Sequence, residues 1–332
     1  MKTKVFLTID TEFSIGGAFH DPQNTQPIGA QNVMCAVGGR SEGLGFLLET
    51  FAAHGLRATF FVEALQTAYF GDEPMREIVG RIGAAGHDLQ LHLHPVWTYF
   101  DHPQWQQQLA LVQPNDDLQG RSVEQLVAWM QRGIDTFWRW GVPPPVALRT
   151  GNLRVDSNVY RAMSQVGLTV ASNVARAVFE PAEPQLRLNS GVHLVEGVVE
   201  LPVLTYTDLQ LGSRAHRKGL TITGSSFGEA RCLLNRAHAV GVPAVVLLTH
   251  CHELVKGDMR SSCVPDRVNQ RRLEAVCRFL RDNDDRFEVT TMDRMVSWHD
   301  AAAVPDTPMM SVPVPLAVMR MAQNKLNELN IL

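Results

Sequence analysis

Three pairs of ionisable residues in this chain share a two-residue spacing, and each pair closes an apolar run that is typical of a buried β-strand. The pairs are Asp10 with Glu12, His92 with His94, and His250 with His252. Side chains two positions apart on a strand point to the same face. If the three strands lie side by side in a parallel sheet, these groups meet at one edge, where burying them is costly without a partner. A divalent metal ion beside an acid–base pair would be that partner. The alternative interpretation is that the three pairs mark unrelated strand ends.

The histidine pair has the spacing of a metal site. Alternation in the segment 88–95, DLQLHLHP, places His92 and His94 on one face and three leucines on the other. Imidazoles at this spacing can bind one borderline metal ion, and a carboxylate often completes the set. Trp97 follows the strand and is predicted to form a wall of the site. An H-x-H pattern alone is a weak signal, so its weight comes from the other two pairs.

The carboxylates of Asp10 and Glu12 would repel each other if both were ionised with no cation between them. A metal ion bound by one of them removes this repulsion, and the other can then act as a base toward water that the ion activates. Glu12 has the longer side chain and lies nearer the expected mouth of the sheet. Two solvated loop acids are the alternative, but they would leave Asp10 unexplained at the end of an apolar strand.

His250 ends the apolar run of residues 244–249. A histidine at such a position can act as a general acid near neutral pH. His252 and Glu253 are candidates to orient His250 or to contact a substrate. A lone histidine here would more often be structural, and the neighbouring pairs favour the catalytic interpretation.

Arg149 ends another expected strand and begins the sequence R-T-G-N. A buried arginine needs a carboxylate partner, and Asp10 is the natural candidate. Gly151 lets the backbone approach closely, and Asn152 offers a side-chain amide to a substrate. A surface turn is the alternative interpretation of this segment.

Short apolar strands alternate with longer helical patterns along the chain. The expected strands span residues 4–10, 58–63, 88–94, 145–149, 168–172, 198–202, 244–250 and 287–291. The expected helices span about 41–54, 73–85, 104–112, 121–140, 157–166, 226–240 and 267–283. This alternation predicts an α/β fold with a mainly parallel sheet, and the number of units favours a (β/α) barrel over an open sheet. No G-x-G-x-x-G motif follows the first strand, which argues against a dinucleotide-binding fold.

Three segments depart from this alternation. Residues 13–40 form a long loop directly after the two carboxylates, where a functional role is expected, and residues 178–197 are expected to be irregular. We predict a barrel over residues 1–298 and a tail over 299–332, in which prolines precede an amphipathic helix. The apolar face of this helix comprises Leu316, Met319, Ala322, Leu326 and Leu329. The helix either packs back on the barrel or joins a second copy or another partner.

Composition excludes several classes of protein. The 332 residues are 45% hydrophobic and 19% charged, as in ordinary globular domains. A net charge of −4 gives no support for nucleic-acid binding, and no apolar run is long enough for a membrane span. Five irregularly spaced cysteines and the absence of a secretory signal predict reduced thiols and a cytoplasmic location. Cys251, between two histidines, faces the opposite way on the strand and is a minor candidate for a ligand or nucleophile.

Six short segments, taken in order along the chain, resemble the NodB-homology family of polysaccharide deacetylases. They are T-I-D-T-E, R-A-T-F-F-V-E, G-H-D-L-Q-L-H, L-R-T-G-N, V-V-L-L-T-H and R-F-E-V-T-T-M. The resemblance as a whole spans about residues 3–297. Each segment is short, but their shared order makes the resemblance fairly specific. The resemblance implies an irregular (β/α)7-type barrel and a metal-dependent hydrolase that removes N- or O-acyl groups from sugars.

The resemblance also implies roles for individual residues. Asp10 resembles the catalytic base, Arg149 its partner and His250 the catalytic acid. Glu12 and His92 resemble two ligands of one divalent ion, which in this family is zinc or, alternatively, cobalt, nickel or manganese. Leu248 resembles the residue that lines the acyl pocket, and we add Trp97, Asn152 and His252 as further substrate-binding candidates.

The chain departs from the family pattern at two points. The family's second metal histidine usually follows the first by four residues, a position that Val96 occupies here. We therefore assign the role to His94, which shares a face with His92, with His102 as a weaker candidate. The turn R-T-G-N also replaces the family's R-x-P-[YF], so the chain resembles a divergent subgroup.

The predicted reaction is removal of an N-acetyl or N-formyl group from a sugar or glycan precursor in surface-polysaccharide synthesis. Two alternatives remain open at this stage. One is a hydrolase of the same fold that opens a cyclic amide such as allantoin. The other is a barrel that binds a glycan without turning it over, although a pure binder has no need of Asp10, Arg149 and His250 together.

Overall fold

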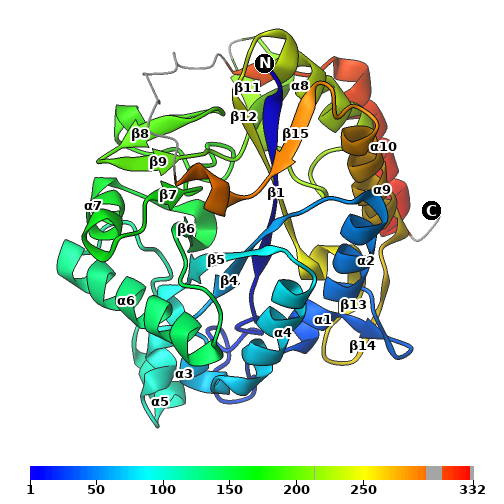
Figure 1. Cartoon of the computed structure of the whole chain (residues 1–332). Helices are drawn as coiled ribbons and strands as arrows, with labels where there is room; N and C mark the ends of the chain where they lie inside the picture. Colours follow the sequence, from blue (N-terminus) through cyan, green and yellow to red (C-terminus); the bar gives the residue numbers. More distant parts are fainter. Residues whose placement is uncertain (213, 297–308, 330–332) are drawn as a thin grey trace.

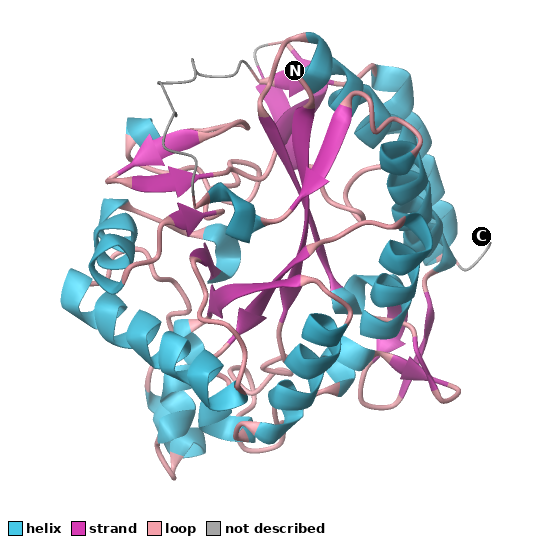
Figure 2. Cartoon of the chain, in the orientation of Figure 1, coloured by secondary structure: helices cyan, strands magenta, loops and turns pink. Residues whose placement is uncertain are grey.

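A curled, mainly parallel sheet forms the centre of the computed structural model, which describes residues 1–212, 214–296 and 309–329, and helices surround it (Figures 1 and 2). The strand order is β12-β1-β4-β5-β6-β7-β9-β8, and β15 also pairs with β1. These strands are β1 (Thr3–Thr11), β4 (Thr59–Glu63), β5 (Asp88–Leu93), β6 (Ala147–Thr150), β7 (Val170–Ala171), β8 (His193–Val195), β9 (Val198–Glu200), β12 (Ala244–His250) and β15 (Phe287–Thr290). All eight strands expected from the sequence are present, and β8 is additional.

The sheet curls far enough for its two ends to meet. After β9 the chain runs alongside β12, where the Leu204 amide donates a 3.1 Å hydrogen bond to the Val246 carbonyl. Further along, the Leu248 amide donates to the Leu220 carbonyl, also at 3.1 Å. Seven parallel strands therefore form an incomplete ring that irregular backbone closes, and the predicted irregular (β/α)7-type barrel is confirmed.

The helices pack around the outside of the barrel (Figure 2). The seven expected from the sequence are present as α2 (Leu44–His54), α4 (Glu73–Ala84), α5 (Trp105–Leu111), α6 (Val123–Trp140), α7 (Ser157–Val166), α8 (Phe227–Ala239) and α9 (Arg267–Arg281). Their boundaries follow local chemistry. In α6, the Ser122 side chain accepts a hydrogen bond from the Gln125 amide at the start, and Gly141 ends the helix in a left-handed conformation.

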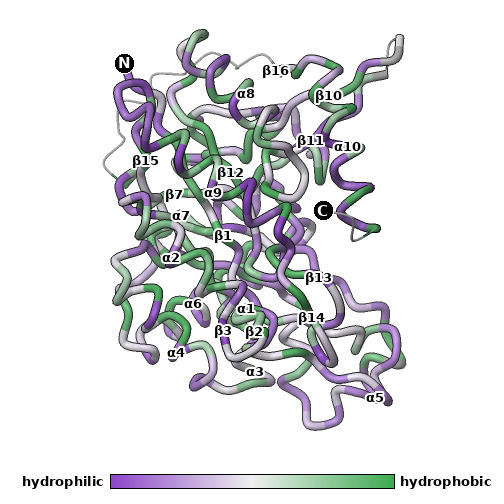
Figure 3. Tube along the Cα trace, turned by 90° about the vertical axis from the view of Figure 1, so that its right-hand side faces the viewer, coloured by the Kyte–Doolittle hydropathy of each residue, from purple (hydrophilic) through white to green (hydrophobic). Residues whose placement is uncertain are grey.

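Strand alternation separates two apolar regions. The odd-numbered residues of β1, such as Val5 and Ile9, pack with helix residues in the larger core, whereas Phe6 belongs to a smaller cluster with Phe61 and Val246. The smaller cluster fills the barrel interior. Asp10 lies on the same face of β1 as Phe6, so the inner face changes from apolar to charged toward the carboxyl ends of the strands. Hydrophobic segments accordingly gather in the interior around β12 in Figure 3.

Several short elements were not expected from the sequence. The predicted loop over 13–40 contains α1 (Gln31–Met34) and a hairpin of β2 (Ala36–Val37) and β3 (Arg40–Ser41). Two further hairpins are formed by β10 (Thr205–Leu211) with β11 (Arg214–Gly219), and by β13 (Val255–Asp258) with β14 (Ser262–Pro265). A short helix α3 (Thr67–Phe70) follows β4, and β16 (Met310–Ser311) pairs with β10. The β10–β11 hairpin lies beside the opening between β9 and β12.

The C-terminal helix α10 (Val314–Glu328) packs against β10 and α8. Figure 3 shows it at the outside of the molecule, close to β10 and β11. Met319 and Leu329, on the predicted apolar face, are 66% and 56% exposed. Arg320 is buried instead and forms ion pairs with Asp208 and Glu229. The helix therefore packs back on the body of the protein, which is one of the two expected alternatives, but polar partners on β10 and α8 hold the face opposite to the apolar one.

The predicted boundary at 298/299 and the first two prolines of the tail, Pro305 and Pro308, lie outside the described residues. None of the helices in the described ranges combines the length and apolar character needed to cross a bilayer.

Candidate metal centre and active site

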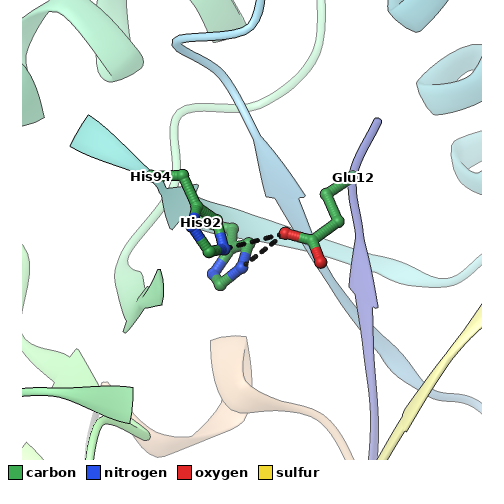
Figure 4. A group of neighbouring side chains, drawn as sticks. All are labelled: Glu12, His92 and His94. Carbon is green, nitrogen blue, oxygen red and sulfur yellow. Dashed lines mark ion pairs between the residues drawn. The ribbon is translucent and has the colours of Figure 1, made fainter. Parts of the chain in front are cut away.

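Glu12, His92 and His94 converge at the mouth of the barrel (Figure 4). Glu12 directly follows β1, His92 lies in β5 and His94 directly follows β5. One carboxylate oxygen, Glu12 Oε2, lies 3.3 Å from His92 Nε2 and 2.9 Å from His94 Nε2. One ligand atom from each of the three residues can be chosen so that all lie within 4.8 Å of one another. Two imidazole nitrogens and a carboxylate oxygen are a donor set that suits zinc, so these residues fit a metal ion.

Hydrogen bonds on the far side of each ring aim both Nε2 atoms at Glu12. His92 Nδ1 lies 2.9 Å from the Arg149 carbonyl oxygen, which fixes it as a donor. His94 Nδ1 lies 2.5 Å from Asp116 Oδ2. Metal-binding histidines commonly use the second ring nitrogen in this way, because it fixes the tautomer and the ring orientation. Both rings are therefore already arranged as Nε2 ligands.

Asp116 was not singled out from the sequence. It lies in the irregular segment between α5 and α6, where no strand or motif marks it. Its Oδ1 accepts a 3.1 Å hydrogen bond from the Val96 amide, and its Oδ2 accepts one of 3.2 Å from Asn152 Nδ2. Three contacts thus hold the carboxylate against His94. The Asn152 amide, predicted to contact substrate, is used at least in part to hold Asp116.

The charges of the cluster perturb one another. Burial alone would raise the pKa of Glu12, but the nearby His94 and His92 outweigh it and hold that pKa well below its ordinary value. Burial would lower the pKa of His94, but Asp116 and Glu12 outweigh it and raise the pKa well above 6.5. The carboxylates of Glu12 and Asp116 therefore favour a positive charge at this position, which a bound cation or a proton on His94 can supply.

The predicted pairing of Asp10 with Arg149 is present inside the barrel. Arg149 is fully buried, and its Nη1 donates to Asp10 Oδ1 at 2.7 Å and to Thr8 Oγ1 at 2.9 Å. Ser172 accepts from the other side of the guanidinium through its carbonyl and hydroxyl oxygens, at 3.1 and 2.7 Å. The ring of Phe61 stacks under the guanidinium at 4.3 Å. Arg149 therefore holds one oxygen of Asp10 and leaves the other directed elsewhere.

That second oxygen faces His250. Asp10 Oδ2 lies 3.7 Å from His250 Nε2, and on the other side of the ring His250 Nδ1 lies 3.2 Å from Glu253 Oε1. Glu253 Oε2 accepts from the His250 amide and from Thr249 Oγ1, so the carboxylate is fixed. Burial would lower the pKa of His250, but Glu253 and Asp10 outweigh it and raise the pKa to about 9. His250 is therefore a protonated acid at neutral pH.

The remaining substrate-binding candidates occupy different surroundings. Leu248 is buried on the inner face of β12, and the His252 ring lies 5.1 Å from that of His250, with a pKa lowered by burial and by His250. Trp97, in contrast, is 1% exposed and packs against Phe70 and Phe100. It supports the mouth from behind and presents almost no surface to a substrate.

The two weaker ligand candidates are not part of the cluster. His102 is exposed at the end of η1 (Pro95–Asp101), where its ring accepts from the Gln104 amide, and it is absent from the metal-ligating group formed by the described residues. Burial raises the pKa of the Cys251 thiol well above its ordinary value. A neutral, buried thiol is a poor ligand and nucleophile, which leaves His94 as the third donor.

Comparisons with known proteins support the fold. No protein-family model and no curated protein matches the sequence. The chain is similar to a "putative polysaccharide deacetylase" from Mycobacterium smegmatis, with 20% identity and a TM-score of 0.51 over 89% of each chain. It is also similar to a family 4 carbohydrate esterase from Streptomyces lividans, with 13% identity and a TM-score of 0.41, over 86% of this chain and 91% of that one. The first likeness shows a common fold, and the expected irregular (β/α) barrel is confirmed.

Proposed function

We propose that this protein is a metal-dependent deacylase that removes an N-acetyl or N-formyl group from a sugar or glycan precursor. One observation carries the proposal: a site suited to one divalent ion and a base–acid pair meet at a single barrel mouth. Glu12 lies two residues beyond Asp10, and His92 bonds the backbone of Arg149, so the two parts share their supports. Hydrolysis of an amide needs this combination of an electrophile, a base and an acid.

Glu12, His92 and His94 would hold the metal ion, with zinc as the first choice and cobalt, nickel or manganese as alternatives. When bound, the ion would polarise the acyl carbonyl and lower the pKa of water. The protein contributes the orientation of the ligands, since the Nδ1 atoms of both histidines are already engaged.

The acid–base work falls to two residues. Asp10, held by Arg149, would take a proton from the attacking water through its free oxygen. His250, kept protonated by Glu253, would donate a proton to the leaving nitrogen. Leu248 on the same face of β12 would border the acyl group, and His252 and Asn152 lie close enough to these groups to contact the sugar.

We place this reaction in the cytoplasm, on a nucleotide- or lipid-linked precursor of a surface polysaccharide. All five cysteines are free thiols, as a reducing compartment favours.

Metal content and acyl release test the proposal together. Purified wild-type protein should contain close to one zinc or similar ion and release acetate or formate from N-acylated sugars. His92→Ala should lose both. His102→Ala is the matched control, because this exposed histidine lies away from the cluster, and it should keep both. Wild-type protein without metal, or full activity in His92→Ala, contradicts the mechanism; ring opening of a cyclic amide without acyl release would favour the alternative hydrolase.

A further inference from the structure

A small cavity lies beside the proposed acid. Its volume is about 180 Å³, and its apolar lining includes Leu153, Val178, Val203 and Leu248. Leu248 precedes His250 by two residues on the same face of β12, so the cavity wall and the acid are about 7 Å apart along the strand. Val178 also lines a wider groove that reaches Asp116 and Asn152. The cavity therefore shares Val178 with the groove that reaches Asp116 and Asn152, and it shares β12 with the proposed acid.

The backbone that forms one wall is held in an unusual conformation. Asn152 and Leu153 both have positive φ angles, of 56° and 52°, although neither is glycine. Such conformations persist only where surrounding contacts enforce them, and they gather at functional sites. The turn is wedged against the metal site, because a Cβ added to Gly151 would lie 2.6 Å from His94 Nδ1. Leu153 is thereby fixed in the cavity wall.

The cavity lining also includes a lysine that has no ion-pair partner among the described residues. His216, Arg217 and Lys218 of β11 all line the cavity. His216 pairs with Asp208 and Arg217 with Glu180, each at 2.6 Å. Lys218 is half-buried and forms no hydrogen bond or ion pair with the described residues. Burial, with a contribution from Arg320, lowers its pKa, so its charge is not fully compensated by the more distant carboxylates.

The neighbouring rim is also rich in positive charge. Three arginines converge on the single carboxylate of Glu180, with Arg176 at 2.7 Å, Arg217 at 2.6 Å and Arg187 at 3.9 Å. One carboxylate cannot neutralise three guanidinium groups, and Lys218 adds a further cation. This excess occurs in a chain whose net charge is −4, so it is local. A positive cavity with apolar walls concentrates anions.

We propose that this cavity binds an anionic group of the substrate, a phosphate or a carboxylate, and that the Lys218 amine is its direct ligand. Arg217 contributes charge at the same wall, and the apolar side chains contact carbon atoms of the substrate. This inference rests on the proposed deacylase function and narrows its substrate class to anionic N-acyl sugars.

Deacylated sugars test the cavity without turnover. Titration calorimetry would compare three amino sugars. Glucosamine carries no anionic group, glucosamine 1-phosphate carries a phosphate, and muramic acid carries a carboxylate. Wild-type protein should bind at least one anionic sugar about tenfold or more tightly than glucosamine, as expected for a charged hydrogen bond. The better of the two anions identifies whether phosphate or carboxylate is the natural group. Equal binding of all three sugars would overturn the proposal.

Substitution of the lysine assigns the effect to this cavity. Lys218→Met keeps the aliphatic stem and should remove the preference for the anionic sugar, whereas Lys218→Arg should keep most of it. Lys325→Met, at an exposed lysine of α10, is the matched control and should bind as wild type does. A preference that survives in Lys218→Met contradicts the role of Lys218.

A second measurement uses unmodified protein, in case Lys218→Met folds poorly. The rate at which acetic anhydride modifies Lys218, followed by mass spectrometry of peptides, should fall severalfold with the anionic sugar and not with glucosamine. Equal rates would overturn the proposal. Acyl release is assayed separately on neutral and on anionic N-acylated sugars. Its absence from both kinds of sugar alongside a clear anion preference would reject the deacylase and leave the anion site standing, whereas release without any anion preference would reject the anion site alone.

Discussion

Of the three arginines that are buried among the described residues, Arg149 and Arg320 form ion pairs with carboxylates, and the contrast between these two separates the proposed catalytic use of charge from a structural one. Arg149 in the barrel mouth bonds one oxygen of Asp10, whose other oxygen faces His250. Arg320 on the inner face of α10 donates to Asp208 and Glu229, and the remaining oxygens of those carboxylates accept from His216 and from the Ser226 amide. The first arrangement leaves an acceptor for substrate chemistry, whereas the second uses every acceptor to fasten a helix.

Replacing each arginine by methionine tests this contrast most directly. Either change leaves a buried carboxylate without its partner, so each should lower the free energy of unfolding by about 3–5 kcal/mol. Arg149→Met should also lower kcat/KM at least about 10²-fold, because Asp10 loses its position. Arg320→Met should leave the activity of the folded fraction close to wild type. Urea unfolding and acyl-release assays, performed below the unfolding transition, measure the two effects separately.

Inactivation of the folded fraction by Arg320→Met would show that the contact under α10 also serves the active site. Arg154→Met provides a surface control for both variants, since this arginine is 46% exposed beside Asp117 and should change stability by less than about 1 kcal/mol.

The hydrogen bond from His94 to Asp116 should give the next largest effect. Asp116→Ala removes the acceptor that orients His94, and it should weaken zinc binding about 10- to 100-fold. Because Asp116 lies in a loop at the mouth, the unfolding free energy should change little. Competition with a chromophoric chelator measures the zinc affinity. Asp117→Ala is the matched control, as its carboxylate contacts Arg154 instead, and an equal loss of zinc in both variants would reject the assignment.

The contact between His250 and Glu253 sets the expected pH dependence. With a pKa of about 9, His250 stays protonated at neutral pH, so wild-type activity should decline only as the pH rises through about 9. Glu253→Gln removes the largest favourable contribution to the charged ring, and the alkaline decline should move toward the ordinary value of about 6.5. A pH profile of kcat/KM measures both limbs, and an unshifted alkaline limb in the variant would contradict the pairing.

The same pairing has a consequence for stability. The pKa of folded His250 is raised above its unfolded value, so the pairing stabilises the protein fully below about pH 6.5. This stabilisation should be lost progressively as the pH rises through about 9. Glu253→Gln should therefore be less stable than wild type at pH 6, and the difference should shrink by pH 10.

What could be predicted from the sequence follows from strand periodicity. Asp10, His92, Arg149 and His250 lie in strands whose alternation fixes their face, and parallel pairing brings the carboxyl ends together. The Asp10–Arg149 bond could therefore be predicted from two separate segments. The role of Asp116 could not be predicted, because this residue lies in a loop with no periodicity. Its contact with His94 depends on where that loop folds.

The same limit explains the helix α10. Its apolar spacing was correctly recognised as one face, but periodicity does not say which face meets the barrel. The answer depended on Asp208 and Glu229, which lie 112 and 91 residues away from Arg320 in the sequence. The unexpected β10–β11 hairpin supplies the first of these carboxylates, so missing the hairpin meant missing the partner.

The outward apolar face of α10 gives the smallest expected effect. Homo-oligomerisation through this helix stays a prediction, and the face can support only weak association. A helix of 15 residues is about 22 Å long and about 10 Å wide, so one copy covers far less than the roughly 800 Å² per partner of a stable interface. Sedimentation velocity should therefore show mass rising only at high protein concentration.

Met319→Ser should abolish that rise and change the unfolding free energy by less than about 0.5 kcal/mol, because the side chain is 66% exposed. Val240→Ser, at a similarly exposed apolar residue after α8, is the control that should leave the association unchanged. If Met319→Ser instead destabilised the monomer strongly, the apolar face of α10 would be packed within the chain. The distinction between Arg320, which holds the helix in place, and an apolar face that contacts only solvent would then be contradicted.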